Sequence, residues 1–269
     1  LIFLTGLRFV YKTFMKQMSL AIIILLSFFS QITMAEECVI LLHGLGRTEK
    51  SMNKMGAALK EEDFRVVNYY YPSRKYKIEI LADKFIPDAL QKCGDADNIN
   101  FVTHSLGGIL LRQYQENHVI ENIKRTVMLG PPNNGSQVID KLRDFPGFGL
   151  IVGKAGLQLG TTDHDLPPRL GSAKNEVGII AGDRSVNLIL SLFLPNPDDG
   201  KVSVQNTKLV GMKDHLVVSV SHPFLMRDSD VIHQVIHFIN HGEFEKKALQ
   251  KDAEIPAESV AFPLEILGE

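Results

Sequence analysis

A short polar sequence in the middle of the chain has the residue types of a nucleophilic site. Ser105 follows an apolar run at 99–102 and precedes a helical pattern that begins at Leu106. A strand, a tight turn with a serine and then a helix form a nucleophile elbow, whose strained turn requires small neighbours. Gly107 meets that requirement, whereas Thr103 stands where such turns usually have glycine. The alternative interpretation is that Ser105 only caps the helix.

An activated serine needs a general base, and strand direction sorts the nine histidines. His222 follows the last expected strand, 215–221, and therefore faces the same sheet edge as Ser105. His215 begins that strand and lies at the opposite edge. His104 adjoins the serine, but we expect its side chain to point to the other side of the strand end. We interpret the histidines of the final helix as surface or packing residues: His233, His237 and His241.

The base in turn needs an acid to orient it, and the preceding loop offers one. Asp199 stands directly before Gly200 in a stretch rich in turn residues, and we favour it. Asp198 and Asp183 remain rivals, the second because it follows the strand expected at 177–181. The alternative for the two neighbouring aspartates is an ordinary turn or a cation site.

Backbone amides that stabilise an oxyanion are expected from two places. Leu106 begins the helix after the serine, and its N–H points toward the reacting carbonyl. The loop after the first strand, His43-Gly44-Leu45-Gly46, contains two glycines that let the backbone approach the serine. The N–H of Leu45 is then expected beside that of Leu106. We expect His43 to fix this loop rather than to act as a catalyst.

The elements that position these residues alternate between strand-length apolar runs and helical patterns. Such alternation predicts a mostly parallel sheet of about six strands with helices on both faces. Residues 137–174 contain too many glycines and prolines for a core element, and we interpret them as a lid-like insertion or, alternatively, a long loop. Expected strands are 38–43, 65–70, 99–104, 125–129, 177–181 and 215–221, and expected helices are 50–62, 77–92, 106–117, 186–192 and 223–240.

The N-terminus has the pattern of a secretory signal peptide. Met15 to Met18 lead into an apolar run, and small residues stand before a cleavage site expected after Ala35. The alternative is an uncleaved membrane anchor, because residues 18–34 carry no charge. The first residue is Leu, so translation is also compatible with a start at Met15. We therefore assign 1–35 to export, 36–244 to the folded domain and 245–269 to a peripheral tail, in a periplasmic or secreted protein.

Charge and cysteine usage narrow the class of protein. The net charge of −2 becomes about −5 without residues 1–35, which carry three bases and no acid. This balance offers no basic patch for nucleic acid. Two cysteines in an exported protein favour a disulfide between Cys38 and Cys93, and the alternative is two inert thiols.

Taken together, the glycine loop and the order Ser105, Asp199, His222 resemble the α/β-hydrolase superfamily, in particular small bacterial lipases and esterases. The resemblance covers most of residues 38–241. Because the first strand leads directly to the oxyanion loop, the sequence resembles compact members of the superfamily that lack an initial hairpin. The resemblance implies a compact α/β-hydrolase fold and an acyl-enzyme mechanism that needs no cofactor.

The resemblance also implies substrate contacts. His43 and Gly44 in the first loop, and Asn133 and Asn134 in the loop after strand 125–129, match the substrate side of such lipases. Some relatives bind calcium through an acid two residues after the catalytic histidine. Phe224 stands there, so we expect no metal site of that type.

The leading functional hypothesis is an exported monomeric hydrolase of lipid-like or short acyl esters, with transient contact to membrane surfaces. A thioesterase or an acyltransferase with the same three residues is an alternative, because the pocket and not the triad selects the acceptor. A different class, a hydrolase-like binding protein without turnover, is less consistent with three chemically competent residues.

Overall fold

The computed structural model describes Met15, Met18 and residues 36–245. It divides into two units, Leu1–Ala35 and Glu36–Glu269, and the architecture below is that of the second. Most of the expected signal peptide and most of the expected tail lie outside the described residues. Within the described part, no helix is both long and apolar enough to cross a membrane.

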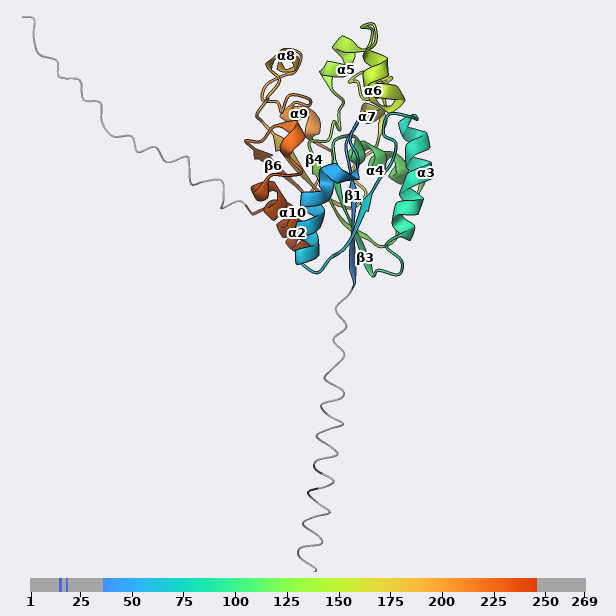
Figure 1. Ribbon diagram of the computed structural model, residues 1–269, viewed down its shortest axis with the longest axis vertical. Helices are drawn as coiled ribbons and strands as arrows, with labels where there is room; N and C mark the ends of the chain where they lie inside the picture. The colour runs from blue at the N-terminus through green and yellow to red at the C-terminus, as the bar shows by residue number, and fades with distance from the viewer. Residues whose placement is uncertain (1–14, 16–17, 19–35, 246–269) are drawn as a thin grey trace, which may run out of the picture. The chain divides into compact units, whose positions relative to one another are not determined.

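Six parallel strands form one sheet in the order β2-β1-β3-β4-β5-β6 (Figure 1). This confirms the expected strand number and direction. Parallel strands are covered on both faces and therefore have continuous apolar sequences, as in β1, where residues 38–42 are all fully buried. The strands are β1 (Glu37–Leu42), β2 (Arg65–Tyr69), β3 (Asn98–His104), β4 (Ile123–Leu129), β5 (Glu176–Gly182) and β6 (Asp214–Val218).

Helices cover the two faces of the sheet in pairs (Figure 1). On one face α3 (Ile78–Gln91) and α4 (Leu106–Asn117) pack against alternate residues of β1, including Ile40. On the other face α2 (Asn53–Glu61) and α10 (Ser229–His241) pack against the intervening ones, including Leu41. A short 3₁₀ turn, η1 (Glu49–Met52), precedes α2. The alternation of side chains along a strand thus divides the core into two layers.

A disulfide joins Cys38 at the start of β1 to Cys93 just after α3, and both residues are fully buried. The expected pairing of the two cysteines is confirmed. The bridge ties a central strand to the end of a covering helix.

The C-terminal elements differ from the expected ones. The last strand ends at Val218 rather than at 221, and a 3₁₀ turn, η2 (His222–Phe224), follows. The helix expected from residue 223 begins at Ser229, after Asp228 caps it by accepting hydrogen bonds from two backbone amides. The cap at Asp228 fixes this later start, because its side chain satisfies amides that the first helical turn leaves without partners. His222 therefore lies on a turn beyond the strand.

Short helices lie over the carboxyl ends of the strands (Figure 1). The segment 137–174, expected as an insertion, contains α5 (Gln137–Leu142), α6 (Phe148–Gly156) and α7 (Leu166–Arg169). Opposite it in the view lies α8 (Leu188–Ser191), which is only four residues long where a helix over 186–192 was expected. The other short helix is α9 (Val204–Thr207).

Candidate active site

The turn between β3 and α4 holds Ser105 in a strained conformation. Its φ is 53° and its ψ is −117°, a region that residues with a side chain rarely adopt. The Ser105 amide donates to the carbonyl of Leu129 at 2.9 Å, which fixes the turn to the end of β4. The Ser105 hydroxyl makes no capping hydrogen bond to α4. The interpretation of Ser105 as a helix cap is therefore wrong.

Small residues around the turn allow this conformation. A Cβ at Gly107 would lie 2.6 Å from the carbonyl oxygen of Leu42, so only glycine fits between α4 and β1. Thr103, which replaces the usual glycine, is fully buried and faces Gly108, where a Cβ would lie 3.2 Å from the Thr103 hydroxyl oxygen. The glycine at 108 thus provides the room that the threonine at 103 occupies.

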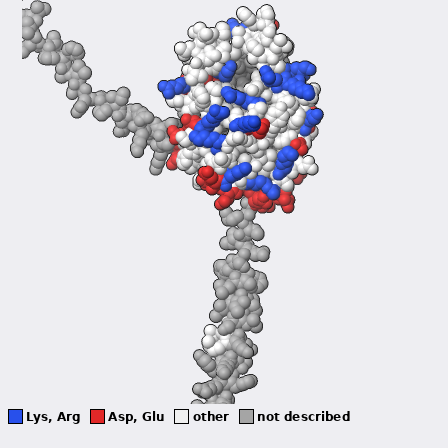
Figure 2. Space-filling model, viewed as in Figure 1, with Lys and Arg blue, Asp and Glu red and all other residues white. Residues whose placement is uncertain are grey.

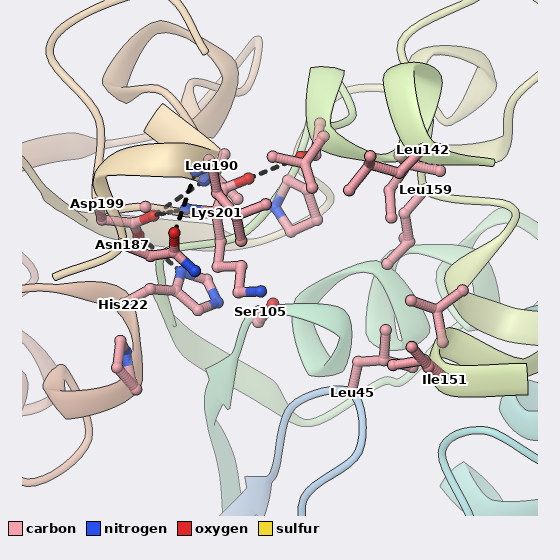
Figure 3. Close-up of a pocket in the computed structure, with 18 of the residues that line it drawn as sticks. Leu45, Ser105, Leu142, Ile151, Leu159, Asn187, Leu190, Asp199, Lys201 and His222 are labelled. Atoms are coloured by element: carbon pink, nitrogen blue, oxygen red, sulfur yellow. Dashed lines mark hydrogen bonds and ion pairs between the residues drawn. The ribbon is translucent and has the colours of Figure 1, made fainter. Parts of the chain in front are cut away.

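His222 and Asp199 form a buried hydrogen-bonded pair. The His222 Nδ1 lies 2.6 Å from the Asp199 Oδ2 (Figure 3), and the His222 amide donates to the Asp199 carbonyl at 3.0 Å. The other carboxylate oxygen, Oδ1, accepts from the amides of Lys201 and Val202 at 3.0 and 2.9 Å. A carboxylate at Nδ1 holds the proton there and leaves Nε2 as the basic ring nitrogen.

The rival acids have other surroundings. Asp198 is buried, but its Oδ1 accepts from the Ser191 hydroxyl and the Gly200 amide, both at 2.7 Å, which closes the turn. Asp183 is exposed at the end of β5. Among residues 36–245, the acid that bonds to the His222 ring is Asp199.

His104 lies closer to this pair than the sequence indicated. Its Nε2 is 3.1 Å from the carbonyl oxygen of His222, and the two rings are 4.8 Å apart. The His104 side chain lies on the sheet face opposite Thr103, as strand alternation predicts, and the turn that carries His222 packs on that same face. Burial and the neighbouring His222 hold the pKa of His104 well below its usual value. A neutral His104 thus supports the backbone of the turn that carries His222.

The loop after β1 approaches the serine closely. A Cβ at Gly44 would lie 3.3 Å from that of Ser105. His43 is fully buried, stacks on Tyr71 at 4.2 Å, and bonds through Nδ1 to the Gly44 carbonyl. Leu106 is the first residue of α4, so its N–H has no acceptor within the helix. The loop and the helix start thus meet at the nucleophile.

A cavity of about 490 Å³ opens beside Ser105 and His222 (Figure 3). Most of its wall on the insertion side is apolar, and the expected substrate residues are not among the described residues that line it. Asn133 is buried and bonds to Arg112, whereas Asn134 binds the Lys208 carbonyl at the surface. The apolar wall consists of Leu45, Val138, Ile139, Leu142, Phe148, Ile151, Val152 and Leu159.

Sequence reasoning did not identify Arg112. This buried guanidinium donates to backbone oxygens of Asn133, Leu170 and Gly171, and burial lowers its pKa to about 10. It joins the loop after β4 to the end of the insertion. An arginine in the apolar face of a helix was the available signal, because such a charge requires buried acceptors.

The fold is similar to that of solved α/β-hydrolases, as the comparison with known structures shows. The mature lipase BlEst2 from Bacillus licheniformis matches with a TM-score of 0.59 and 18% identity over 77% of this chain and 91% of that one. The esterase RhEst1 from Rhodococcus sp. ECU1013 matches with a TM-score of 0.51 and 16% identity over 77% of this chain and 91% of that one. An extracellular α/β-hydrolase from a Paenibacillus species matches with a TM-score of 0.50 and 14% identity over 75% of this chain and 98% of that one. No protein-family model and no curated protein match this sequence.

Proposed function

We propose that this protein is an exported serine hydrolase that cleaves carboxylic esters with an apolar acyl group. The observation that carries the proposal is the buried Asp199–His222 pair, which opens onto the same cavity as the strained Ser105. The structural neighbours include proteins described as a lipase and an esterase, which agrees with this reaction.

In the proposed mechanism, the Ser105 oxygen attacks the ester carbonyl while the Nε2 of His222 accepts the hydroxyl proton. Asp199 remains ionised and stabilises the resulting imidazolium. The amides of Leu45 and Leu106 bind the oxyanion, and His222 then returns the proton to the leaving alcohol. Water, deprotonated by His222, attacks the acyl-enzyme and releases the acid and free Ser105.

The apolar wall supports an acyl chain as the group transferred. A chain that lies against Leu142, Ile151 and Leu159 removes apolar surface from water, which stabilises the complex by about 25 cal/mol per Å². Transient contact with a lipid surface is also part of the proposal, because exposed apolar side chains flank the cavity. They lie on α6 and α8, in the mostly uncharged lobes at the top of Figure 2: Leu150, Ile151, Leu188 and Ile189.

Export is proposed from the signal-like sequence at 1–35 and is supported by the disulfide. Structural disulfides persist in oxidising compartments and are rare in the cytosol. The Cys38–Cys93 bridge is consistent with a periplasmic or secreted protein.

Labelling with a fluorophosphonate tests the proposal directly. We expect the purified protein to form a covalent adduct that mass spectrometry maps to Ser105, and the Ser105→Ala variant to remain unlabelled and inactive on p-nitrophenyl esters. A folded protein that hydrolyses no ester and takes no label would contradict the proposal and favour a binding protein with this fold.

A further inference from the structure

Two cationic side chains line the cavity beside the candidate nucleophile. Arg47 comes from the loop after β1, and Lys201 comes from the turn that also holds Asp199. In Figure 3 the Lys201 side chain extends toward Ser105. A pocket for an uncharged ester has no need of two cations at the reacting centre, since each must be partly desolvated when substrate enters.

Both cations are available to a ligand. Among residues 36–245, no carboxylate forms an ion pair with Arg47 or Lys201. The nearby Asp199 already binds His222 and two backbone amides. Partial burial lowers the pKa of Lys201, Asp199 opposes this, and the charge of Arg47 lowers it further, so the two cations are close enough to repel each other. An anion bound between them would relieve that repulsion.

A second cavity continues the basic character away from the serine. Its volume is about 460 Å³, and it shares Arg47 with the first. Arg74 and Lys75 contribute further positive charge, and the hydroxyl-bearing residues Thr48 and Ser73 complete a polar wall. Basic side chains lie beside and below the hollow between the two lobes at the top of Figure 2. The site therefore has an apolar side on the insertion and a basic side across Arg47.

We propose that the natural substrate is an acyl ester whose alcohol portion carries a phosphate, which Arg47 and Lys201 bind while the acyl chain lies on the apolar wall. This inference rests on the proposed function. A guanidinium binds two phosphate oxygens at once and an ammonium adds a point charge, so the pair suits a group with several acceptor oxygens. The second cavity holds whatever extends beyond the phosphate, and Arg74 and Lys75 favour further negative charge there.

Two matched substrates test the proposal: 1-dodecanoyl-glycerol-3-phosphate and the neutral 1-dodecanoylglycerol, both below their aggregation limits. Release of dodecanoic acid gives kcat/KM for each. We expect the phosphate to raise kcat/KM at least tenfold in the wild-type protein, and the Arg47→Gln and Lys201→Gln variants each to reduce that ratio about tenfold, which equals about 1.4 kcal/mol. Lys60→Gln, an exposed cation on α2 outside both cavities, is the control and should leave the ratio unchanged.

The outcomes separate this inference from the proposed function. If the folded wild-type protein hydrolyses neither ester, the proposed function is overturned. Equal hydrolysis of both, or a phosphate preference that Arg47→Gln and Lys201→Gln leave intact, would overturn only the phosphate site. Dodecanoyl coenzyme A, a thioester whose thiol portion carries phosphates, distinguishes the source of the phosphate. A kcat/KM for this thioester that exceeds the value for the glycerol phosphate ester, and that falls in Arg74→Gln, would support the basic site with a thioester as the substrate.

Discussion

Replacing Asp199 by asparagine exchanges one carboxylate oxygen for an NH₂ group and is expected to reverse the hydrogen bonding of His222. The Asp199 Oδ1 accepts from two backbone amides, so the asparagine oxygen must occupy that position. The opposite orientation would place an NH₂ group against two buried N–H donors and leave them without acceptors, at a cost of about 1–3 kcal/mol each. The asparagine NH₂ therefore faces the Nδ1 of His222.

An NH₂ at that position requires Nδ1 to accept a hydrogen bond, which moves the ring proton to Nε2. The nitrogen that should remove the Ser105 proton then already carries one. Where an asparagine replaces the acid of a serine triad in this way, kcat falls by about 10⁴-fold. We expect a loss of that size here, with little change in stability, because the packing and the two amide contacts remain.

The assay compares kcat on a p-nitrophenyl ester and the rate of fluorophosphonate labelling for three variants with equal circular dichroism. Asp198→Asn retains the Oδ1 that binds Gly200, and Asp183→Asn changes an exposed side chain, so both should keep kcat within about tenfold of the wild-type value. An Asp199→Asn variant with nearly wild-type kcat would refute the reasoning. Loss of activity in Asp183→Asn instead would assign the acid to the end of β5.

Three further predictions concern stability and are checked by urea unfolding. Replacing Cys38 and Cys93 by alanine should lower the free energy of unfolding by about 4 kcal/mol, because the bridge closes a loop with a sequence separation of 55. Burial holds the pKa of His104 well below its ordinary value of 6.5, so the unfolded chain alone binds this proton just below that pH, and His104 should contribute a loss of about 1.4 kcal/mol of stability per pH unit as the pH falls below about 6.5. His43 and His215, whose pKa values are also lowered, contribute in the same direction; His104→Gln should therefore reduce the slope by its own share, and an unchanged slope would contradict a neutral His104. Arg112→Met should cost about 3 kcal/mol, because buried carbonyl groups lose their donor, and wild-type stability would show that water replaces it.

Strand number and direction were predictable because alternating apolar runs and helical patterns constrain how a chain crosses a sheet. The neighbours of each strand were not, since alternation says nothing about which strands pair, and the order β2-β1-β3-β4-β5-β6 comes from the structure. The end of the last strand was placed three residues late. Residues 219–221 are Ser-Val-Ser, which contain neither glycine nor proline, so nothing in the sequence before Pro223 marks the end of the strand.

Part of the candidate site followed from the same logic. The rule that carboxyl ends of parallel strands share an edge separated His222 from His215, whose Nε2 lies 2.9 Å from the Thr207 hydroxyl. It did not reveal the contact of His104 with the His222 carbonyl, because the sequence does not show where the turn after the last strand packs. Nor did it pair Arg47 with Lys201, since nothing in the sequence relates a loop after β1 to a turn far along the chain.

Gly130 illustrates where the limit lies. Its φ is 54°, and a Cβ there would be 3.0 Å from both the Asp199 Oδ2 and the His222 Nδ1. In the sequence, a glycine before Pro131 indicates only a turn. The reason that it must lack a side chain arises from two residues on later segments, whose hydrogen bond passes over it. Such a requirement becomes visible only when β4, the Asp199 turn and the His222 turn are placed together.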